Sequence, residues 1–253
     1  MKYPLEERLH QLGWHLTAHQ LDGLTEDASK HNVSYLEFFH TLVSLEWESR
    51  QSGQLAKRVK RAKLPYTKTI HDFDFSFQPS ISEQRVKETL TCRYIANGEN
   101  RILLGPPGVG KTHLAVSFAL EAITQGATAL FLTADDVAAE CQKAEVKGTL
   151  SRLVSKWSRP DLLIIDEVGY FPFDELAANV FFQVVSRRYE KGAIILTSNK
   201  SYIEWGKVFG DDVLATAILD RLLHHAVTFN IKGESYRLRE KKKAGVFPVS
   251  KPK

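Results

Sequence analysis

The stretch GPPGVGKT at residues 105–112 is the part of the sequence that decides the fold. It fits the pattern G-x-x-x-x-G-K-[ST], and it stands between the apolar run RILL (101–104) and the helical run HLAVSFALEAI (113–123). In such a loop the glycines let successive backbone N–H groups point at phosphate oxygens, and the following helix presents its positive N-terminal end to the same anion. The pattern predicts a phosphate-binding loop between a buried strand and a helix.

Two side chains of this loop are expected to act on a nucleoside triphosphate. Lys111 should reach the β- and γ-phosphates, and the Thr112 hydroxyl should hold Mg²⁺. The pattern arises by chance in roughly one unrelated chain of this length in a hundred, and the flanking strand and helix make an accidental glycine turn rarer still. We therefore interpret the loop as a site for ATP and Mg²⁺. The residues expected to contact the nucleotide here are Gly105, Pro106, Pro107, Gly108, Val109, Gly110, Lys111, Thr112 and His113.

A second motif, LLIIDE at residues 162–167, is an apolar strand that ends in two carboxylates. It has the form of a Walker B segment, which is weak evidence alone and strong evidence beside a phosphate-binding loop. Asp166 is expected to bind Mg²⁺ directly or through water and so to contact the nucleotide site, and Glu167 is expected to polarise the attacking water. The alternative is that Glu167 only begins a solvated loop. A base at this position favours hydrolysis over phosphoryl transfer to a metabolite.

The strand AIILTSN at residues 193–199 ends in Asn199. Its amide would lie beside the γ-phosphate as a second group that orients water, the role called sensor 1. An asparagine that merely ends a strand in a turn is the alternative. The catalytic residues expected in the same subunit are therefore Lys111, Glu167 and Asn199.

Several arginines could complete the site. Arg221, in ILDRLL (218–223), is expected to enter the site of a neighbouring subunit as a catalytic group, because an arginine donated in trans neutralises charge on the transferred phosphoryl group. Arg187 and Arg188 form a second candidate pair, although surface arginines are usually solvated or salt-bridged. Arg237, in SYRLRE, is a candidate contact to the nucleotide of its own subunit, with DNA or solvent as the alternative.

A helix is expected at about residues 82–96, and after it short apolar runs alternate with amphipathic stretches. This alternation predicts an α/β fold in which helices cover both faces of a parallel sheet. The expected strands are 101–104, 129–133, 162–166 and 193–197, with a fifth, which has polar flanks, at 227–231.

The first part of the chain has a helical pattern throughout, with leucines and then aromatic residues at helical spacing. Ser34 and Asn32 are candidate caps for its second helical stretch. Pro65 and the alternating aromatics of residues 71–81 break the pattern. We predict a small all-α domain at residues 1–65, a linker at 66–81, and an ATPase domain with a basic C-terminal tail at 82–253.

The composition is that of an ordinary folded protein. Of the 253 residues, 43% are hydrophobic and 25% are charged, which excludes a disordered or fibrous chain. No apolar run approaches the ~20 residues of a membrane span, and the N-terminus lacks a signal-peptide core, so a cytoplasmic protein without a membrane partner is expected. Cys92 and Cys141 form no CxxC pair, which argues against a zinc site. The adjacent His224 and His225 indicate no metal site either, because neighbours on a helix do not share a face.

The positive charge is concentrated in two segments. Residues 50–68 hold seven basic and no acidic residues, and residues 232–253 hold eight basic residues against two glutamates. Such segments attract polyphosphate backbones by counterion release, although a single run is often only a solvated face. Duplex DNA is therefore an expected partner. The candidate DNA-binding residues are Lys57, Arg58, Lys60 and Arg61.

Six segments taken together resemble the IstB family of transposition helper proteins, which is similar to the DnaC-type helicase loaders in the initiator branch of the AAA+ ATPases. The resemblance extends over nearly the whole chain, and it implies the AAA+ form of the P-loop NTPase fold, with three layers. It also implies an ATP-dependent homo-oligomer that grips duplex DNA, bends target sites and recruits or activates the transposase of a mobile element. The segments are GPPGVGKTHLA, LLIIDEVGYFPFD, FQVVSRRYEKGAIILTSN, EWGKVFGDD, AILDRLLHH and GESYRLRE.

The resemblance also assigns roles to single residues. The family's DELG motif stands here as DEVG (166–169), an apolar change that keeps both carboxylates. The chain is short after the sensor strand for a full helical lid, which leaves the role of Arg237 open. Lys111 and Thr112 match the family's phosphate-loop positions, and Asp166 and Glu167 match its Walker B pair. Asn199 matches the sensor position, and Arg221 matches the arginine finger that acts between subunits.

The favoured hypothesis is a Mg²⁺-dependent, DNA-stimulated ATPase that helps a transposase and regulates transposition. The first alternative is a replicative helicase loader with the same core. The second is a nucleotide-gated scaffold in which hydrolysis is incidental. A small-molecule kinase is disfavoured, because the sequence shows neither an acceptor pocket nor an arginine-rich lid.

Overall fold

The computed structural model describes residues 4–243, so the last part of the predicted basic tail lies outside the described residues. The chain divides into two compact units, Met1–Lys57 and Arg58–Lys253. The boundary falls within the third helix, a few residues before the predicted domain end at residue 65.

The N-terminal unit consists of helices. They are α1 (Pro4–Gln11), α2 (His15–Lys30) and the greater part of α3 (Tyr35–Ala62). Ser34 caps α3 in a reciprocal arrangement: its hydroxyl accepts from the Glu37 N–H at 3.3 Å, and its own N–H donates to the Glu37 carboxylate at 3.1 Å. The buried carboxylate of Glu46 on α3 accepts from the backbone N–H of Thr17 on α2 at 3.3 Å. This bond ties the two long helices together.

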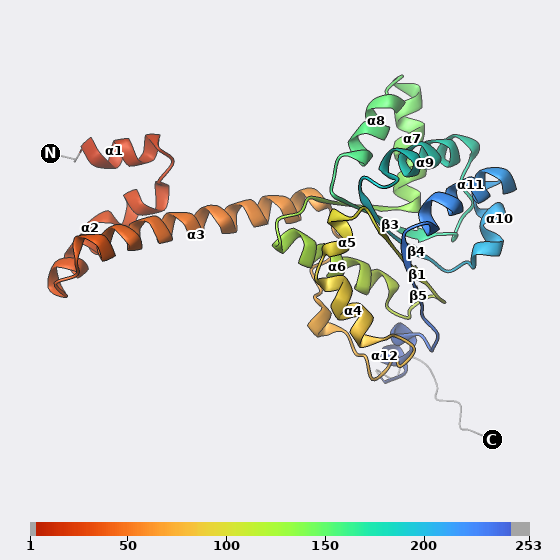
Figure 1. Cartoon of the computed structure of the whole chain (residues 1–253), viewed down its shortest axis with the longest axis horizontal. Helices are drawn as coiled ribbons and strands as arrows, with labels where there is room; N and C mark the ends of the chain where they lie inside the picture. Colours follow the sequence, from red (N-terminus) through yellow and green to blue (C-terminus); the bar gives the residue numbers. More distant parts are fainter. Residues whose placement is uncertain (1–3, 244–253) are drawn as a thin grey trace. The chain divides into compact units, whose positions relative to one another are not determined.

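The second unit is built on a five-stranded sheet in which every pairing is parallel, in the order β2-β3-β4-β1-β5 (Figure 1). The structure confirms the α/β prediction and all five expected strands, including the one with polar flanks. Because the strands are parallel, their carboxyl ends meet at one edge of the sheet. The strands are β1 (Asn100–Leu104), β2 (Ala129–Thr133), β3 (Leu162–Val168), β4 (Ala193–Ser198) and β5 (Ala226–Asn230).

Helices cover both faces of this sheet (Figure 1). On one face lies α6, against which α4 packs, and on the other lie α7, α9 and α11. The helix predicted at 82–96 is broken into α4 and α5, because Cys92 takes a left-handed φ of 58°. None of the helices at residues 4–243 has the length and apolarity to cross a membrane. The helices are α4 (Glu83–Leu90), α5 (Arg93–Ala96), α6 (Lys111–Thr124), α7 (Ala134–Val146), α8 (Leu150–Ser158), α9 (Glu175–Arg188), α10 (Trp205–Phe209), α11 (Asp212–Leu223) and α12 (Tyr236–Lys243), with short 3₁₀ turns at Ile70–Asp72 and Tyr202–Glu204.

The two-sided burial explains why the strands are continuous apolar runs. Alternate strand residues such as Leu104, Leu132 and Ile165 belong to one core cluster with the side chains of α7, α9 and α11. The residues between them, such as Leu103 and Ile164, are also buried and point to the opposite face, where α6 lies. A sheet packed in this way holds the ends of its strands rigidly, and the candidate site is built on those ends.

Candidate nucleotide-binding site

The phosphate-binding loop leaves β1 at Gly105 and enters α6 at Lys111. Gly108 and Gly110 have φ values of 81° and 97°, in the left-handed region that residues other than glycine rarely adopt. Space requires glycine as well: a Cβ on Gly110 would lie 2.6 Å from the Phe73 ring, and one on Gly108 would collide with Ser235. The local sequence therefore fixes the curled backbone at the N-terminus of α6, where backbone N–H groups and the helix dipole favour an anion.

The side chain of Lys111 is buried and turns back toward the start of the phosphate-binding loop. Its Nζ donates to the carbonyls of Gly105 and Pro106 at 2.7 and 2.8 Å. Burial lowers the pKa of Lys111 to about 8, an effect that the nearby Arg237 reinforces and the carboxylate of Asp166 opposes. An incoming phosphate would replace the carbonyls as partner and favour the charged form.

Thr112 and Asp166 lie in direct contact at the carboxyl edge of the sheet. The Thr112 hydroxyl is 2.9 and 3.1 Å from the two Asp166 carboxylate oxygens. Asp166 also accepts a hydrogen bond from the Thr197 hydroxyl on β4 and is only 3% exposed. A hydroxyl and a carboxylate at this spacing are the hard oxygen ligands that Mg²⁺ prefers, so these residues fit the ion that the sequence predicts.

Glu167 stands at an irregularity in β3. The pairing of β3 with β4 shifts register between Ile165 and Val168, and Glu167 takes a left-handed φ of 64°. Its N–H donates to the Thr197 hydroxyl at 3.0 Å, which holds this strained turn in place. Burial and then the charge of Asp166 raise the pKa of the Glu167 carboxyl, which makes its carboxylate a stronger base.

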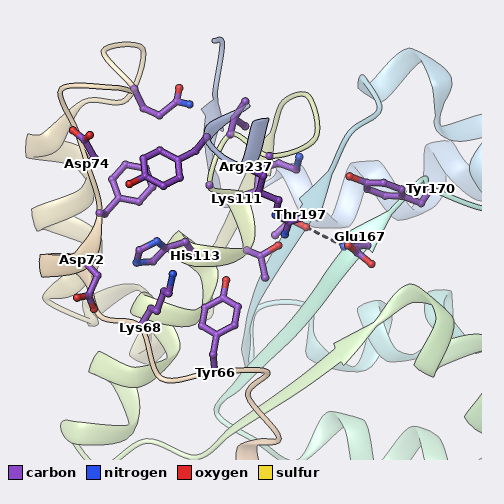
Figure 2. A pocket seen from close by; sticks show the side chains of 17 residues that line it. Tyr66, Lys68, Asp72, Asp74, Lys111, His113, Glu167, Tyr170, Thr197 and Arg237 are labelled. Atoms are coloured by element: carbon purple, nitrogen blue, oxygen red, sulfur yellow. Dashed lines mark hydrogen bonds between the residues drawn. The ribbon is translucent and has the colours of Figure 1, made fainter. Parts of the chain in front are cut away.

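These residues surround a cavity of about 340 Å³ (Figure 2). Of the residues predicted to contact the nucleotide, Gly105, Pro106, Pro107 and Asp166 do not line it. Figure 2 shows Lys111 and Arg237 reaching into the space between Glu167 and the residues of the 66–78 segment. The wall is lined by Tyr66, Lys68, Asp72, Phe73, Asp74, Gln78, Gly108, Val109, Gly110, Lys111, Thr112, His113, Glu167, Tyr170, Thr197, Tyr236 and Arg237.

The segment at residues 66–81 forms one wall of the cavity, although the sequence predicts a linker there. The imidazole of His113 on α6 lies 2.8 Å from the Thr69 carbonyl, and its ring packs edge-on to Phe73. Tyr66 and Lys68 line the cavity from the same segment. Sequence reasoning missed these contacts. The alternating aromatics at 73–77 were the available signal, since a solvated linker has no need of them.

The C-terminal helix α12 also lines the cavity and packs against the 66–81 segment, where the Tyr236 and Phe77 rings are 5.4 Å apart. The Tyr236 N–H donates to the Gly108 carbonyl at 3.0 Å, which brings Arg237 into the same cavity as Lys111 and Glu167. The Ser80 hydroxyl donates to the Lys232 carbonyl at 2.8 Å and so fastens the 66–81 segment to the chain before α12. Arg237 is thus placed where a contact to the nucleotide of its own subunit is possible.

The remaining predicted catalytic residues lie outside the cavity wall. Asn199 follows β4, and its buried Oδ1 has no hydrogen-bond partner among the described residues. Arg221 is half-buried on α11, where it donates to the Ala217 carbonyl at 2.8 Å and lies over the Phe182 ring at 4.9 Å. Since Arg221 does not line the cavity of its own chain, a catalytic role would need a second subunit.

Arg188 is not a surface arginine. It is 2% exposed, and its guanidinium donates to the carbonyls of Pro160 and Ala193, both at 2.7 Å. It also donates to three carbonyls at the end of α8 and before β3, those of Trp157, Ser158 and Asp161. Burial lowers its pKa to about 10, which still leaves it charged at neutral pH. Arg188 is therefore not placed to act in trans, because its side chain is buried and its terminal N–H groups bond carbonyls of its own subunit. Arg187 is exposed and bonds the Ser155 hydroxyl at 3.1 Å.

Replacing Arg188 by methionine is expected to lower the free energy of unfolding by about 3 kcal/mol, because it leaves buried carbonyls without donors. The unfolding midpoint should fall by roughly 6–12 °C in a calorimetric scan. Arg187→Met is the matched control and should change the midpoint by no more than about 2 °C. Equal midpoints for the two variants would contradict the structural role of Arg188.

The four candidate DNA-binding residues lie on the last turns of α3. Lys57, Lys60 and Arg61 are exposed and Arg58 is half-buried. Positions three and four apart lie on one helix face, so Lys57, Lys60 and Arg61 form a basic stripe, and Arg58 lies beside it. The neighbouring Lys63 is instead paired with Glu140 at 3.4 Å.

The sheet order, the phosphate-binding loop after β1 and the acidic pair at the end of β3 define an ATP-binding P-loop protein with the AAA+ fold. The structure of AMPPCP-bound DnaA from Aquifex aeolicus has this fold: it aligns with a TM-score of 0.56 and 24% identity over 76% of this chain. The present chain spans 58% of that DnaA chain. The likeness at this identity concerns the fold alone.

The family follows from sequence comparison. The profile of the IstB-like ATP binding protein family matches residues 7–244, and the chain belongs to this family. It is 48% identical over 242 residues to a protein of insertion sequence IS5376 from Geobacillus stearothermophilus, and 46% identical over 244 residues to a protein of insertion sequence IS21 from Pseudomonas aeruginosa. Both relatives are named as ATP-binding proteins. The alignments cover 96% of this chain, and 96% and 92% of the respective relatives.

Proposed function

We propose that this protein hydrolyses ATP with the help of Mg²⁺. The observation that carries the proposal is the cluster at the ends of β3 and β4, where Asp166 contacts Thr112 and Thr197 while Glu167 and Lys111 line one cavity. Mg²⁺ held by Asp166 and Thr112 would neutralise charge on the phosphates.

Glu167 is placed to act on water. In the proposed reaction, a water oxygen forms a bond to the γ-phosphorus while the bond from that phosphorus to the β–γ bridging oxygen breaks, which gives ADP and phosphate. The water proton passes to the Glu167 carboxylate. Lys111, Arg237 and the N–H groups of residues 108–110 would hold the phosphate oxygens. Phosphate release from ATP that requires Mg²⁺ and stops on addition of EDTA is the direct test; release that continues in EDTA would count against it.

We infer that the ATPase works as a homo-oligomeric helper of a transposase on duplex DNA. Membership in the IstB-like family and the insertion-sequence relatives support this role, and they favour it over that of a helicase loader. The basic stripe on α3 supports DNA binding by its charge and exposure. Capture of the transposase encoded beside the gene, with no capture of a replicative helicase, would distinguish the two roles.

Changing Lys57, Arg58, Lys60 and Arg61 together to glutamine is expected to weaken binding to duplex DNA. Each lost phosphate contact should also flatten the plot of log affinity against log salt by about 0.9 units, so the slope should fall by roughly one to four units. Fluorescence anisotropy with a labelled duplex between about 50 and 200 mM salt measures both quantities.

The control removes the same charge from another exposed surface of the second unit. It changes the basic residues Lys143, Lys147, Arg152 and Arg159 on and beside α7 and α8. The control variant should keep the wild-type slope. An unchanged slope in the α3 variant, or an equal loss in both, would refute the assignment of the stripe.

A further inference from the structure

Three exposed side chains with metal-binding atoms meet at the edge of the sheet opposite the phosphate-binding loop. Glu190 lies in the turn between α9 and β4, and His224 and His225 lie in the turn between α11 and β5. Since β4 and β5 flank β1, the starts of both strands are close in space. One ligand atom of each residue lies within 4.8 Å of the other two.

The two histidines do share a face, contrary to the expectation for neighbours on a helix. His224 is the residue that caps the end of α11, and His225 already leads into β5, so the regular rotation of the helix is lost between them. Their ring centroids are 4.1 Å apart. One oxygen of Glu190 lies 3.4 Å from His225 Nε2 and 3.7 Å from His224 Nδ1.

The surrounding structure holds this arrangement. Glu190 takes a left-handed φ of 57°, a costly conformation for a residue with a side chain, and backbone bonds of the adjacent turn to Arg188 keep it there. The Tyr189 ring stacks on the His224 ring at 5.8 Å and so orients the imidazole. The Tyr189 hydroxyl lies 2.8 Å from His224 Nδ1, and an ion bound through this nitrogen would replace the hydroxyl as its partner. The backbone of His225 is fixed as well, because the Asn100 N–H donates to its carbonyl at 2.7 Å.

We propose that Glu190, His224 and His225 bind a divalent transition-metal ion, with Zn²⁺ as the preferred ion. Two ring nitrogens and a carboxylate oxygen form a donor set that suits zinc, whereas Mg²⁺ and Ca²⁺ prefer oxygen ligands alone. Ligands about 2.1 Å from a tetrahedral ion are about 3.4 Å from each other, close to the two separations measured here. The side chains are about half exposed, so an ion can enter from solvent and water can take the fourth position.

An ion at this site would link two parts of the fold. It would join the turn after α9 to the end of α11, the helix that carries Arg221 in its last turn. A bound ion would restrain the end of that helix.

The test is zinc binding to the full chain without an affinity tag, measured by competition with a chromophoric chelator in the absence of nucleotide. One Zn²⁺ per chain is expected in the wild type. His224→Ala and His225→Ala should each weaken binding by at least about 100-fold. Tyr189→Phe keeps the stacked ring and removes only the hydroxyl that competes for Nδ1, so this variant should not weaken binding. X-ray absorption should show two imidazole ligands. Far-ultraviolet circular dichroism should show that these surface variants fold like the wild type.

Two controls exclude other sources of the zinc. His10 and His15 are a second close pair, with their Nδ1 atoms 3.1 Å apart, and the double alanine variant should keep the wild-type zinc affinity. Asp166→Asn should also keep it, since the ATP site is not involved. No binding by the wild type, unchanged binding by His224→Ala and His225→Ala, or loss of binding in the His10/His15 variant would overturn the proposal.

Discussion

Replacing Glu167 by glutamine is expected to lower the rate of ATP hydrolysis by about 10³-fold while the affinity for Mg-ATP stays within about threefold of wild type. The amide has nearly the shape of the carboxylate, so the turn held by Thr197 should persist. It cannot accept the proton of the attacking water. Single-turnover phosphate release measures the rate, and equilibrium binding of a fluorescent ATP analogue measures the affinity.

Matched variants separate this effect from general damage. Glu175→Gln removes an exposed carboxylate at the start of α9 and should leave the rate unchanged. Lys111→Ala should lose nucleotide affinity as well as hydrolysis, because it removes the phosphate-binding charge. Wild-type hydrolysis by Glu167→Gln would show that this carboxylate is not the base. If the variant lost hydrolysis but kept full transposition activity, hydrolysis would be incidental to a nucleotide-gated scaffold.

Replacing Arg221 by alanine is also expected to lower hydrolysis by about 10³-fold, through loss of a charge donated to a neighbouring subunit. Arg221 lies outside the cavity of its own chain, so its loss should leave the affinity for ATP close to wild type. Arg187→Ala is the control, since that exposed arginine should not be needed for hydrolysis.

Mixing two inactive proteins tests whether Arg221 acts in trans. A Glu167→Gln subunit keeps Arg221, and an Arg221→Ala subunit keeps an intact site of its own. In an equal mixture, about one interface in four pairs an intact site with a donated arginine, so roughly a quarter of wild-type activity should return. No recovery in mixed assemblies would mean that Arg221 acts within its own subunit or only in packing.

The sequence predicted the fold well because local patterns carry the information. Two-sided burial makes strands such as β2, β3 and β4 nearly continuous apolar runs. The edge strand β5 is only partly buried, and it was predicted although its flanks are polar. The break at Cys92 was missed, because a left-handed residue other than glycine leaves no local signature.

Part of the candidate site was also predictable. Lys111, Thr112, Asp166 and Glu167 lie in short motifs beside strand ends, and parallel strands must bring those ends to one edge. Tyr66 and Lys68 could not be found in this way, because they belong to a segment whose pattern resembles a linker. Their place in the cavity depends on packing against α6.

By itself the sequence determined that a phosphate-binding loop, an acidic strand end and a parallel sheet belong together, because each of these is encoded within a few consecutive residues. Only the tertiary structure decided that Arg188 is an internal brace, that α12 brings Arg237 to the phosphate-binding loop, and that Glu190 meets two histidines. These facts join segments that are far apart in the chain. Burial and contact across such separations depend on how the whole chain packs, which no local pattern records.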